Sequence, residues 1–213
     1  MGLFDRFRRP QLERSDASIS EVRAYFEDAA SNEEHYPSSI DPRILFVRRL
    51  LEHLGDLSGK TAADIGSGKG RFARIVKEQN PEANVIAVDI AEAMLKHIPA
   101  GIGRAAATMT HLPLATESID GAWAIESLEH AIDIEAAVAE LTRIVKPGGK
   151  IVIIDKNADK WGQLETPSWE RWFDRRGLDR LLRLHCREVS SGPISYWEDV
   201  PPDGLFLAWF AQK

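Results

Sequence analysis

Two short stretches of the sequence combine residue types that can do chemistry. Residues 64–72, "DIGSGKGRF", place an acid and three glycines within seven positions, and residues 126–133, "ESLEHAID", carry carboxylates beside a histidine. Glycine adopts turn conformations that other residues resist and lets a ligand approach the backbone. Imidazole titrates near neutral pH and can take a proton from a hydroxyl or a phenol. The first stretch therefore predicts a binding loop, and the second a candidate general base, His130.

Three kinds of glycine loop compete for the first stretch. A phosphate-binding loop has the spacing G-x-x-x-x-G-K followed by Ser or Thr, and the corresponding positions here hold Ala63 and Gly70. A dinucleotide-binding loop needs its third glycine where this chain has Arg71. The pattern that remains is acid-x-Gly-x-Gly-x-Gly.

The elements that must position this loop alternate along the chain. Two helical periods, over 18–30 and over 41–55, precede the first strand; in the second, Asp41 is the expected cap and Gly55 the expected end. Short apolar strands are expected at 60–66, 83–90, 102–109, 119–127 and 149–156. Helical periods lie between them at 71–80, 91–98 and 134–146.

Strands that alternate with helices predict a parallel sheet with helices on both faces. The tail differs, because 184–197 and 203–213 look like two strands joined by a short turn that contains proline. We expect a Rossmann-like, doubly wound α/β fold with a seven-stranded, mostly parallel sheet and an antiparallel C-terminal hairpin. In such sheets ligands bind beyond the carboxyl ends of the strands, which is where the glycine loop falls.

The glycine loop resembles motif I of class I S-adenosylmethionine-dependent methyltransferases, and similar motifs run from about Tyr25 to Asp155. The resemblance is to the type 11 methyltransferases and to those of ubiquinone biosynthesis. It implies S-adenosyl-L-methionine as the cofactor, with an acid that helps to hold its methionine end and glycines that lie against it. The residues concerned are Asp64, Gly66, Ser67, Gly68 and Gly70.

Further segments carry the same resemblance. Asp89, at the end of a strand, is expected to accept hydrogen bonds from both ribose hydroxyls, with Ile90 and Met94 beside the adenine. Thr108 stands where the family usually has an acid that reads the adenine, so Thr110 or His111, before Leu112, is the expected contact. Glu126 is expected to touch the cofactor.

Two interpretations of residues 126–130 are open. His130, with Glu129, is the candidate catalytic pair for removing a proton from the acceptor. The spelling Glu126-x-x-Glu129-His130 also resembles methyltransferases in which such a triplet binds a divalent ion, and Mg²⁺ would acidify the acceptor oxygen. In the alternative, Glu129 and His130 face water and cap the following helix.

The acceptor side is expected to come from both ends of the chain. Residues 1–40 are predicted to form a helical cap over the active site, and 41–213 to form the methyltransferase domain, with a lid insertion at about 157–184. Five residues from these segments are candidates for substrate contact: Tyr25, Tyr36, Lys156, Asn157 and Trp161.

Five arginines at helical spacing could recognise an anion or a nucleic-acid backbone, or could form a solvated face paired with Glu170, Asp174 and Asp179. They are Arg171, Arg175, Arg176, Arg180 and Arg183. The first interpretation leads to the second candidate function, an RNA methyltransferase that acts on ribose or base. A third candidate is a cofactor-binding scaffold without catalysis.

Composition favours a small-molecule enzyme. A net charge of −6 argues against coating of nucleic acid, and a nucleic-acid partner is disfavoured. The single cysteine, Cys186, cannot form an internal disulfide. No apolar run approaches the roughly 20 residues of a membrane-spanning helix. Together with what the family resemblance implies, these features lead us to expect a cytoplasmic O-methyltransferase of small molecules, monomeric or homodimeric.

Overall fold

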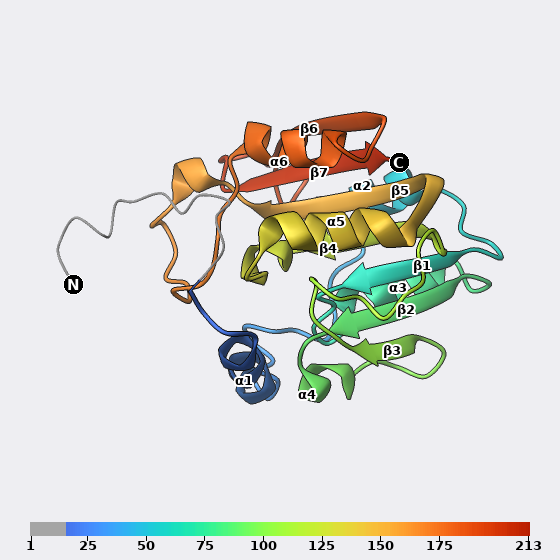
Figure 1. Cartoon of the computed structure of the whole chain (residues 1–213), viewed down its shortest axis with the longest axis horizontal. Helices are drawn as coiled ribbons and strands as arrows, with labels where there is room; N and C mark the ends of the chain where they lie inside the picture. The colour runs from blue at the N-terminus through green and yellow to red at the C-terminus, as the bar shows by residue number, and fades with distance from the viewer. Residues whose placement is uncertain (1–15) are drawn as a thin grey trace.

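A seven-stranded mixed sheet organises the chain (Figure 1). The computed structural model describes residues 16–213. The strand order is β3-β2-β1-β4-β5-β7-β6; the first five strands pair in parallel, and β7 pairs antiparallel with both β5 and β6. The strands are β1 (Thr61–Ile65), β2 (Asn84–Asp89), β3 (Gly103–Ala106), β4 (Ile119–Ile125), β5 (Val145–Lys156), β6 (Glu188–Ile194) and β7 (Phe206–Gln212).

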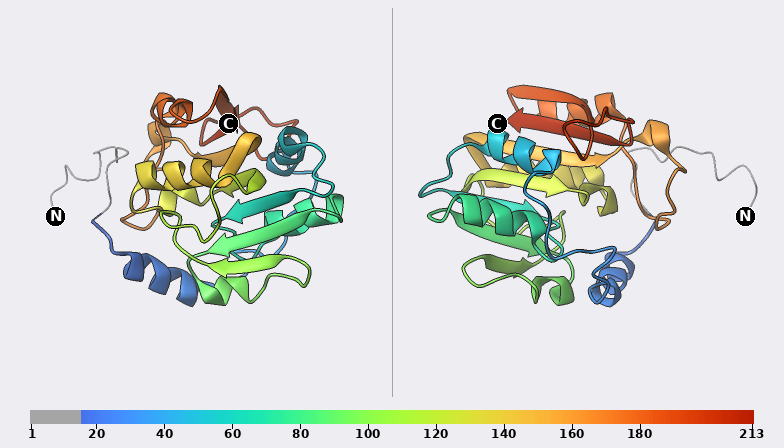
Figure 2. Two further views of the ribbon diagram at one scale, coloured as in Figure 1. Left: turned by 45° about the vertical axis from the view of Figure 1, so that its right-hand side comes forward. Right: turned by 180° about the vertical axis from the view of Figure 1, so that it is seen from behind.

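Helices cover both faces of the sheet, as the front and back views show (Figures 1 and 2). α5 and α6 pack on one face through a buried cluster that includes Leu141 and Leu178. α2 and α3 pack on the other through Leu50 and Phe72. The helices are α1 (Ile19–Ala29), α2 (Leu45–Leu54), α3 (Arg71–Gln79), α4 (Glu92–Leu95), α5 (Ile134–Ile144) and α6 (Arg175–Arg183), with short 3₁₀ turns η2 (Leu128–His130) and η3 (Ala158–Lys160).

The predicted α/β fold is confirmed. Central strands buried on both faces should be continuously apolar, and residues 151–154 of β5 are fully buried isoleucines and a valine. In the strand order, β1 lies beside β4 at the centre of the sheet, where the order reverses, and the glycine loop follows β1.

Three local predictions were wrong. α2 begins at Leu45 rather than near Asp41, because the Asp41 carboxylate accepts hydrogen bonds from the Arg43 backbone and guanidinium; its predicted end at Gly55 is confirmed. The hairpin strands β6 and β7 are joined by the long segment 195–205, not by a short turn. The helix predicted at 91–98 is only the four-residue α4.

The N-terminal helix lies across the carboxyl end of the sheet, away from the two helical layers (Figures 1 and 2). A capping box at Ser18 begins α1, because the hydroxyl accepts from the Glu21 backbone while the Glu21 carboxylate accepts from the Ser18 backbone. The Glu27 carboxylate accepts hydrogen bonds from the first backbone amides of α4. Residues 1–15 of the predicted cap lie outside the described residues. Within residues 16–213, no helix is both long enough and apolar enough to span a bilayer.

Candidate active site

The glycine loop is held against β2 by its own backbone. The amides of Gly66 and Ser67 donate to the Val88 carbonyl at 2.8 and 3.0 Å. Gly66 has a φ of +73°, and a side chain there would meet Met109 Cε at 2.4 Å and Ser127 Cβ at 2.6 Å. The sequence needs glycine at this position because a positive φ and a close neighbour coincide.

Replacing Gly66 with Ala should weaken both the fold and ligand binding. Strain and overpacking should destabilise the protein by about 1–3 kcal/mol, seen as a melting temperature several degrees lower. The new methyl group displaces Met109 and Ser127, which line the cavity, so S-adenosylhomocysteine should also bind more weakly. Gly59→Ala is the matched control, since φ is +68° there but nothing lies within 4 Å. Equal binding losses in the two variants would contradict this account.

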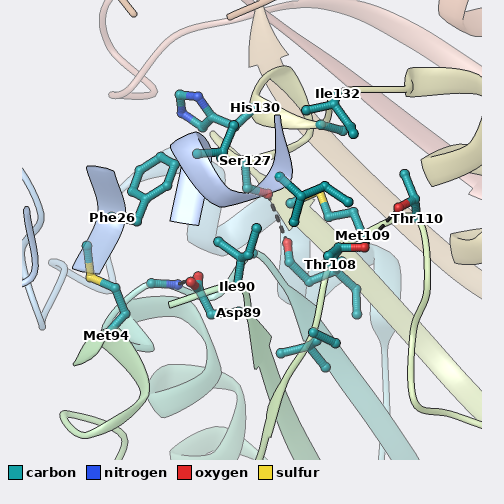
Figure 3. Close-up of a pocket in the computed structure, with 18 residues that line it drawn as sticks. Phe26, Asp89, Ile90, Met94, Thr108, Met109, Thr110, Ser127, His130 and Ile132 are labelled. Carbon is teal, nitrogen blue, oxygen red and sulfur yellow. Dashed lines mark hydrogen bonds between the residues drawn. The ribbon is translucent and has the colours of Figure 1, made fainter. Parts of the chain in front are cut away.

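Asp89 is the buried acid beside the loop. Its Oδ2 accepts from the Gly68 amide at 2.7 Å, and its Oδ1 accepts from the Ala91 amide at 2.9 Å. Burial raises the pKa of this carboxyl to about 6, although these backbone hydrogen bonds oppose the shift. The carboxylate sits on the wall of a cavity at the ends of β1, β2 and β4 (Figure 3).

The cavity measures about 90 Å³ and is mostly apolar in its lining. The glycine loop and β2 supply one wall, the segment after β3 another, and η2 with α1 the cover (Figure 3). Of the residues proposed from the sequence, it brings together Gly66, Gly68, Asp89, Ile90, Met94, Thr110 and His130.

Several proposed cofactor residues do not line this cavity. Asp64 is buried behind the loop, where it accepts from the Ala73 amide at 3.1 Å and ties α3 to β1; burial raises its pKa to about 7. Gly70 has a φ of +80°, and a side chain there would meet Ile98 at 2.3 Å, so it shapes the turn. The remaining residues outside the lining are Ser67, His111, Leu112 and Glu126.

Glu126 is held away from the cavity in an ionic network. Its Oε1 accepts from Arg71 Nη2 at 2.8 Å and from the Tyr196 hydroxyl at 3.0 Å. Its φ of +52° is unusual for a residue with a side chain and costs of the order of 1 to 3 kcal/mol. This network joins the glycine loop, the end of β4 and the 195–205 segment.

His130 lies at the cavity edge, next to a buried ionic cluster. The Lys156 ammonium pairs with Glu129 Oε1 and lies 3.1 Å from Glu170 Oε1. His130 Nε2 is 3.5 Å from Glu129 Oε1, and Nδ1 is 3.8 Å from Glu170 Oε2. Burial and the nearby ammonium lower the pKa of the imidazole to about 3, so His130 is neutral. Burial and Asp155 raise the pKa of Glu129.

The five proposed substrate residues do not line the cavity. The Tyr36 hydroxyl donates to the Tyr25 hydroxyl at 3.2 Å, and Tyr25 packs edge-on against Trp169. Asn157 donates to the Gly204 carbonyl, and Trp161 packs against the buried Trp172. Lys156 belongs to the ionic cluster.

Sequence reasoning missed most of the apolar lining. Phe26 packs edge-on against His130 with ring centroids 4.9 Å apart, and Ser127 donates to the Ile65 carbonyl at 2.9 Å. Ser127 directly follows Glu126, which was already a candidate cofactor residue, and this neighbourhood was the signal that could have pointed to Ser127. The other missed lining residues are Ile19, Val22, Ile65, Val88, Ala107, Thr108, Met109, Ala131 and Ile132.

The five arginines of residues 171–183 do not form the single helical face, paired with acids, that the sequence predicted. α6 begins at Arg175, so Arg171 is not on the helix. The expected acidic partners are engaged elsewhere: Glu170 binds Lys156 and Trp172, and Asp174 caps α6 through the Gly177 amide. Within residues 16–213, no ion pair joins these arginines to those acids.

Known proteins share both sequence and fold with this chain. Residues 63–153 match the family model described as a methyltransferase domain. The chain is 31% identical over 170 residues to the methyltransferase GfsG of Streptomyces halstedii, a match that covers 72% of this chain and 60% of that protein. It is 31% identical over 145 residues to the malonyl-[acyl-carrier protein] O-methyltransferase of Dechloromonas aromatica, covering 68% and 51%.

The fold comparison agrees. A solved structure from Thermotoga maritima, described as an S-adenosylmethionine-dependent methyltransferase and possible histamine N-methyltransferase, superposes with a TM-score of 0.66 at 22% identity, covering 90% of this chain and 99% of that one. This chain spans 60% or less of the two curated relatives. With the matched domain, the glycine loop and the acid at the end of β2, the chain belongs to the class I S-adenosylmethionine-dependent methyltransferases.

Proposed function

We propose that this protein transfers a methyl group from S-adenosylmethionine to an oxygen of a small molecule. The observation that carries this proposal is the placement of the His130 imidazole at the edge of a cavity that Gly66 and Asp89 also line. Methyl transfer from a sulfonium depends mostly on proximity and alignment. A base is needed only where the acceptor has a proton to lose, and a hydroxyl is such an acceptor.

The residues present fit the cofactor. Gly66 leaves space that a side chain would fill, and Asp89 offers a carboxylate for the ribose hydroxyls. Ile90 and Met94 provide apolar contacts for the adenine, and Thr110 provides a polar one. When bound, the cofactor supplies an electrophilic methyl group on a positively charged sulfur. The residues of the chain bind and orient the cofactor and exclude water from the cavity.

The acceptor should be compact and partly apolar. Val22 of α1 lines the cavity, and so do Phe26 of α1 and Ile132 after η2, which lie near His130 (Figure 3). The relatives include an O-methyltransferase that acts on a malonyl group carried by a protein, which is consistent with an oxygen acceptor.

The N-terminal cap and the lid insertion stay predictions, and two contacts support the cap. Lys69 of the glycine loop, whose side chain is 1% exposed, pairs with Glu33 at 2.8 Å and lies 3.3 Å from the Asn32 carbonyl. Glu27 binds α4. We infer that the cap is fastened to the glycine loop and α4, and must loosen for cofactor exchange. A cytoplasmic location and a monomeric or homodimeric state also stay predictions.

The proposed magnesium triplet does not fit these residues. Glu126 is held by Arg71 and Tyr196, while Glu129 points to Lys156. A different group, Glu129, His130 and Glu170, has ligand atoms within 4.8 Å of one another, but the Lys156 ammonium pairs with both glutamates. The cluster thus already contains a cation, and we assign no step to a metal.

The RNA methyltransferase is the second candidate. Arg175, Arg176 and Arg180 are exposed on α6, and none of the three lines the cavity. An enzyme of this kind would need an arginine surface continuous with the cofactor cleft and would bind RNA more tightly at low salt. A scaffold that binds the cofactor without turnover is the third candidate.

An assay with labelled cofactor tests the acceptor. Tritiated S-adenosylmethionine is incubated with three probes, a dihydroxybenzoate ester, a long-chain acyl malonate and a primary aromatic amine. We expect label in the phenol or the malonate, because those acceptors carry an oxygen nucleophile, and little in the amine. Transfer to the amine alone would contradict oxygen methylation. Transfer to a short transcript, absent with all three small molecules, would favour the RNA candidate.

A further inference from the structure

The buried acids behind His130 exceed the buried bases. Two carboxyl groups, of Glu129 and Glu170, pair with the Lys156 ammonium, and a third, of Asp155, accepts hydrogen bonds from the backbone amides of Glu129 and Lys156. The side chains of the two glutamates are 1% and 2% exposed. Uncompensated buried negative charge is costly, so this cluster favours a nearby group that can hold positive charge or donate a hydrogen bond.

The two oxygens of Glu170 have different partners. Oε1 accepts from Trp172 Nε1 at 2.6 Å and from Lys156 Nζ at 3.1 Å. Oε2 has neither of these bonds and lies 3.8 Å from His130 Nδ1. Two fixed donors therefore orient the carboxylate so that its second oxygen faces the imidazole.

His130 Nδ1 is the matching unsatisfied group. It is buried without a hydrogen-bond partner among the described residues. Nε2 lies 3.5 Å from Glu129 Oε1, but that oxygen already accepts a hydrogen bond from the Lys156 ammonium, so Glu170 Oε2 is the freer acceptor for an imidazole N–H. Catalytic hydrogen bonds are often long before substrate binds and tighten afterwards, and a shortening of under 1 Å would bring Oε2 into hydrogen-bond range of Nδ1.

We propose that Glu170 is a positioning residue that accepts a hydrogen bond from Nδ1–H of His130 and so leaves Nε2 free to take a proton. This inference rests on the proposed function. Nε2 takes the proton of the acceptor hydroxyl as the new oxygen–methyl bond forms and the sulfur–methyl bond breaks, with its electron pair left on sulfur. The imidazolium, stabilised by Glu170, then releases the proton to solvent. Setting the tautomer is the role that an orienting carboxylate has in other acid–base pairs.

Glu170→Gln is the sharpest variant, because the amide has the same shape as the carboxylate. Its oxygen can still accept from Trp172 and Lys156, which leaves the amide nitrogen facing Nδ1. That nitrogen is a donor and favours the tautomer with hydrogen on Nε2, which cannot act as a base. We expect kcat to fall about 100-fold or more, with the affinity for S-adenosylhomocysteine unchanged within about twofold.

Nitrogen NMR of the imidazole reads the tautomer without an acceptor. The full chain, labelled with ¹⁵N-histidine, is measured at pH 8, where His130 is neutral and Glu170, whose pKa burial and Glu129 raise to about 7, is ionised. His130→Gln identifies the His130 signals. We expect Nδ1–H in the wild type and Nε2–H in Glu170→Gln. The same tautomer in both proteins would overturn the proposal, and so would Nε2–H in the wild type.

A matched control makes the same change elsewhere. Asp120 pairs with Lys146 at the opposite end of β4, so Asp120→Asn also removes a carboxylate from a lysine and should leave the His130 tautomer and kcat unchanged. A tautomer that switches in Glu170→Gln without loss of kcat would support the positioning role of Glu170 but would remove His130 from the proposed chemistry. The two failures are therefore distinguishable.

Discussion

Asp89→Ala should weaken the binding of S-adenosylhomocysteine about 100-fold. In the proposed complex the Asp89 carboxylate accepts hydrogen bonds from both ribose hydroxyls. Hydrogen bonds to a charged acceptor are worth roughly 1.5–3 kcal/mol each, so loss of the pair should cost about 3 kcal/mol, which corresponds to about 100-fold in Kd. The carboxylate also accepts from the Gly68 amide, and its removal loosens the loop that faces the ligand. Isothermal titration calorimetry measures the change.

Two controls separate binding from folding. Asp89→Asn keeps one acceptor oxygen and should lose less affinity than the alanine variant. Thermal unfolding without ligand reports any damage to the loop. Wild-type affinity in Asp89→Ala, with the fold intact, would remove Asp89 from the ribose site.

The same carboxyl predicts a pH dependence of binding. Its pKa in the free protein is raised to about 6 by burial. The ligand hydroxyls bind the carboxylate form, so affinity is full well above this pKa and falls as pH drops through it, by up to about tenfold per unit. Calorimetry between pH 5 and pH 8 tests the direction. The fall should be absent in Asp89→Ala, which separates it from any effect of Asp64.

His130→Ala should lower kcat for a hydroxyl acceptor by about 10² to 10⁴, the usual contribution of general acid–base catalysis. Alignment of the cofactor does not depend on the imidazole, so the affinity for S-adenosylhomocysteine should change little. Single-turnover transfer from tritiated cofactor measures the chemical step. We expect the loss to be smaller for a carboxylate acceptor, which has no proton to give up at neutral pH.

A double variant tests whether Glu129 and His130 contribute to catalysis beyond alignment of the two reactants. Methyl transfer to a hydroxyl that persists when Glu129 and His130 are both replaced by Ala would leave alignment as the whole of catalysis. The ionic cluster is buried, so the stability of the double variant must be measured in parallel. Without Glu129, the Lys156 ammonium still has its ion pair with Glu170.

Part of the cavity lining could be predicted from sequence because it depends on local requirements. A glycine with positive φ and an acid at a strand end are specified by neighbours close along the chain, as at Gly66 and Asp89. The sheet followed for the same reason, since buried parallel strands are continuously apolar.

The surroundings of Glu126 and His130 could not be predicted in this way because their partners come from distant segments. Glu126 was expected at the cofactor, but Tyr196 from the β6–β7 connection and Arg71 from α3 hold it elsewhere. Glu170 was expected on a solvated face with arginines and is instead buried beside His130. Helical spacing gave no indication of this, because Glu170 precedes α6.

The apolar cover was also hidden from sequence reasoning. Phe26 lies on α1, and about half of the chain separates it in sequence from His130, which it contacts. A phenylalanine at helical spacing is an ordinary core residue, and only the position of α1 across the sheet end brings it to the cavity (Figure 3).

The most direct test of the account is a calorimetric titration of the full chain with S-adenosylhomocysteine, once with magnesium and once with EDTA. We predict one molecule bound per chain with the same heat and affinity in both buffers, because Lys156 already provides the cation of the Glu129–Glu170 cluster. No binding in either buffer would contradict the assigned cofactor site. Binding that requires magnesium would contradict the metal-free site described above.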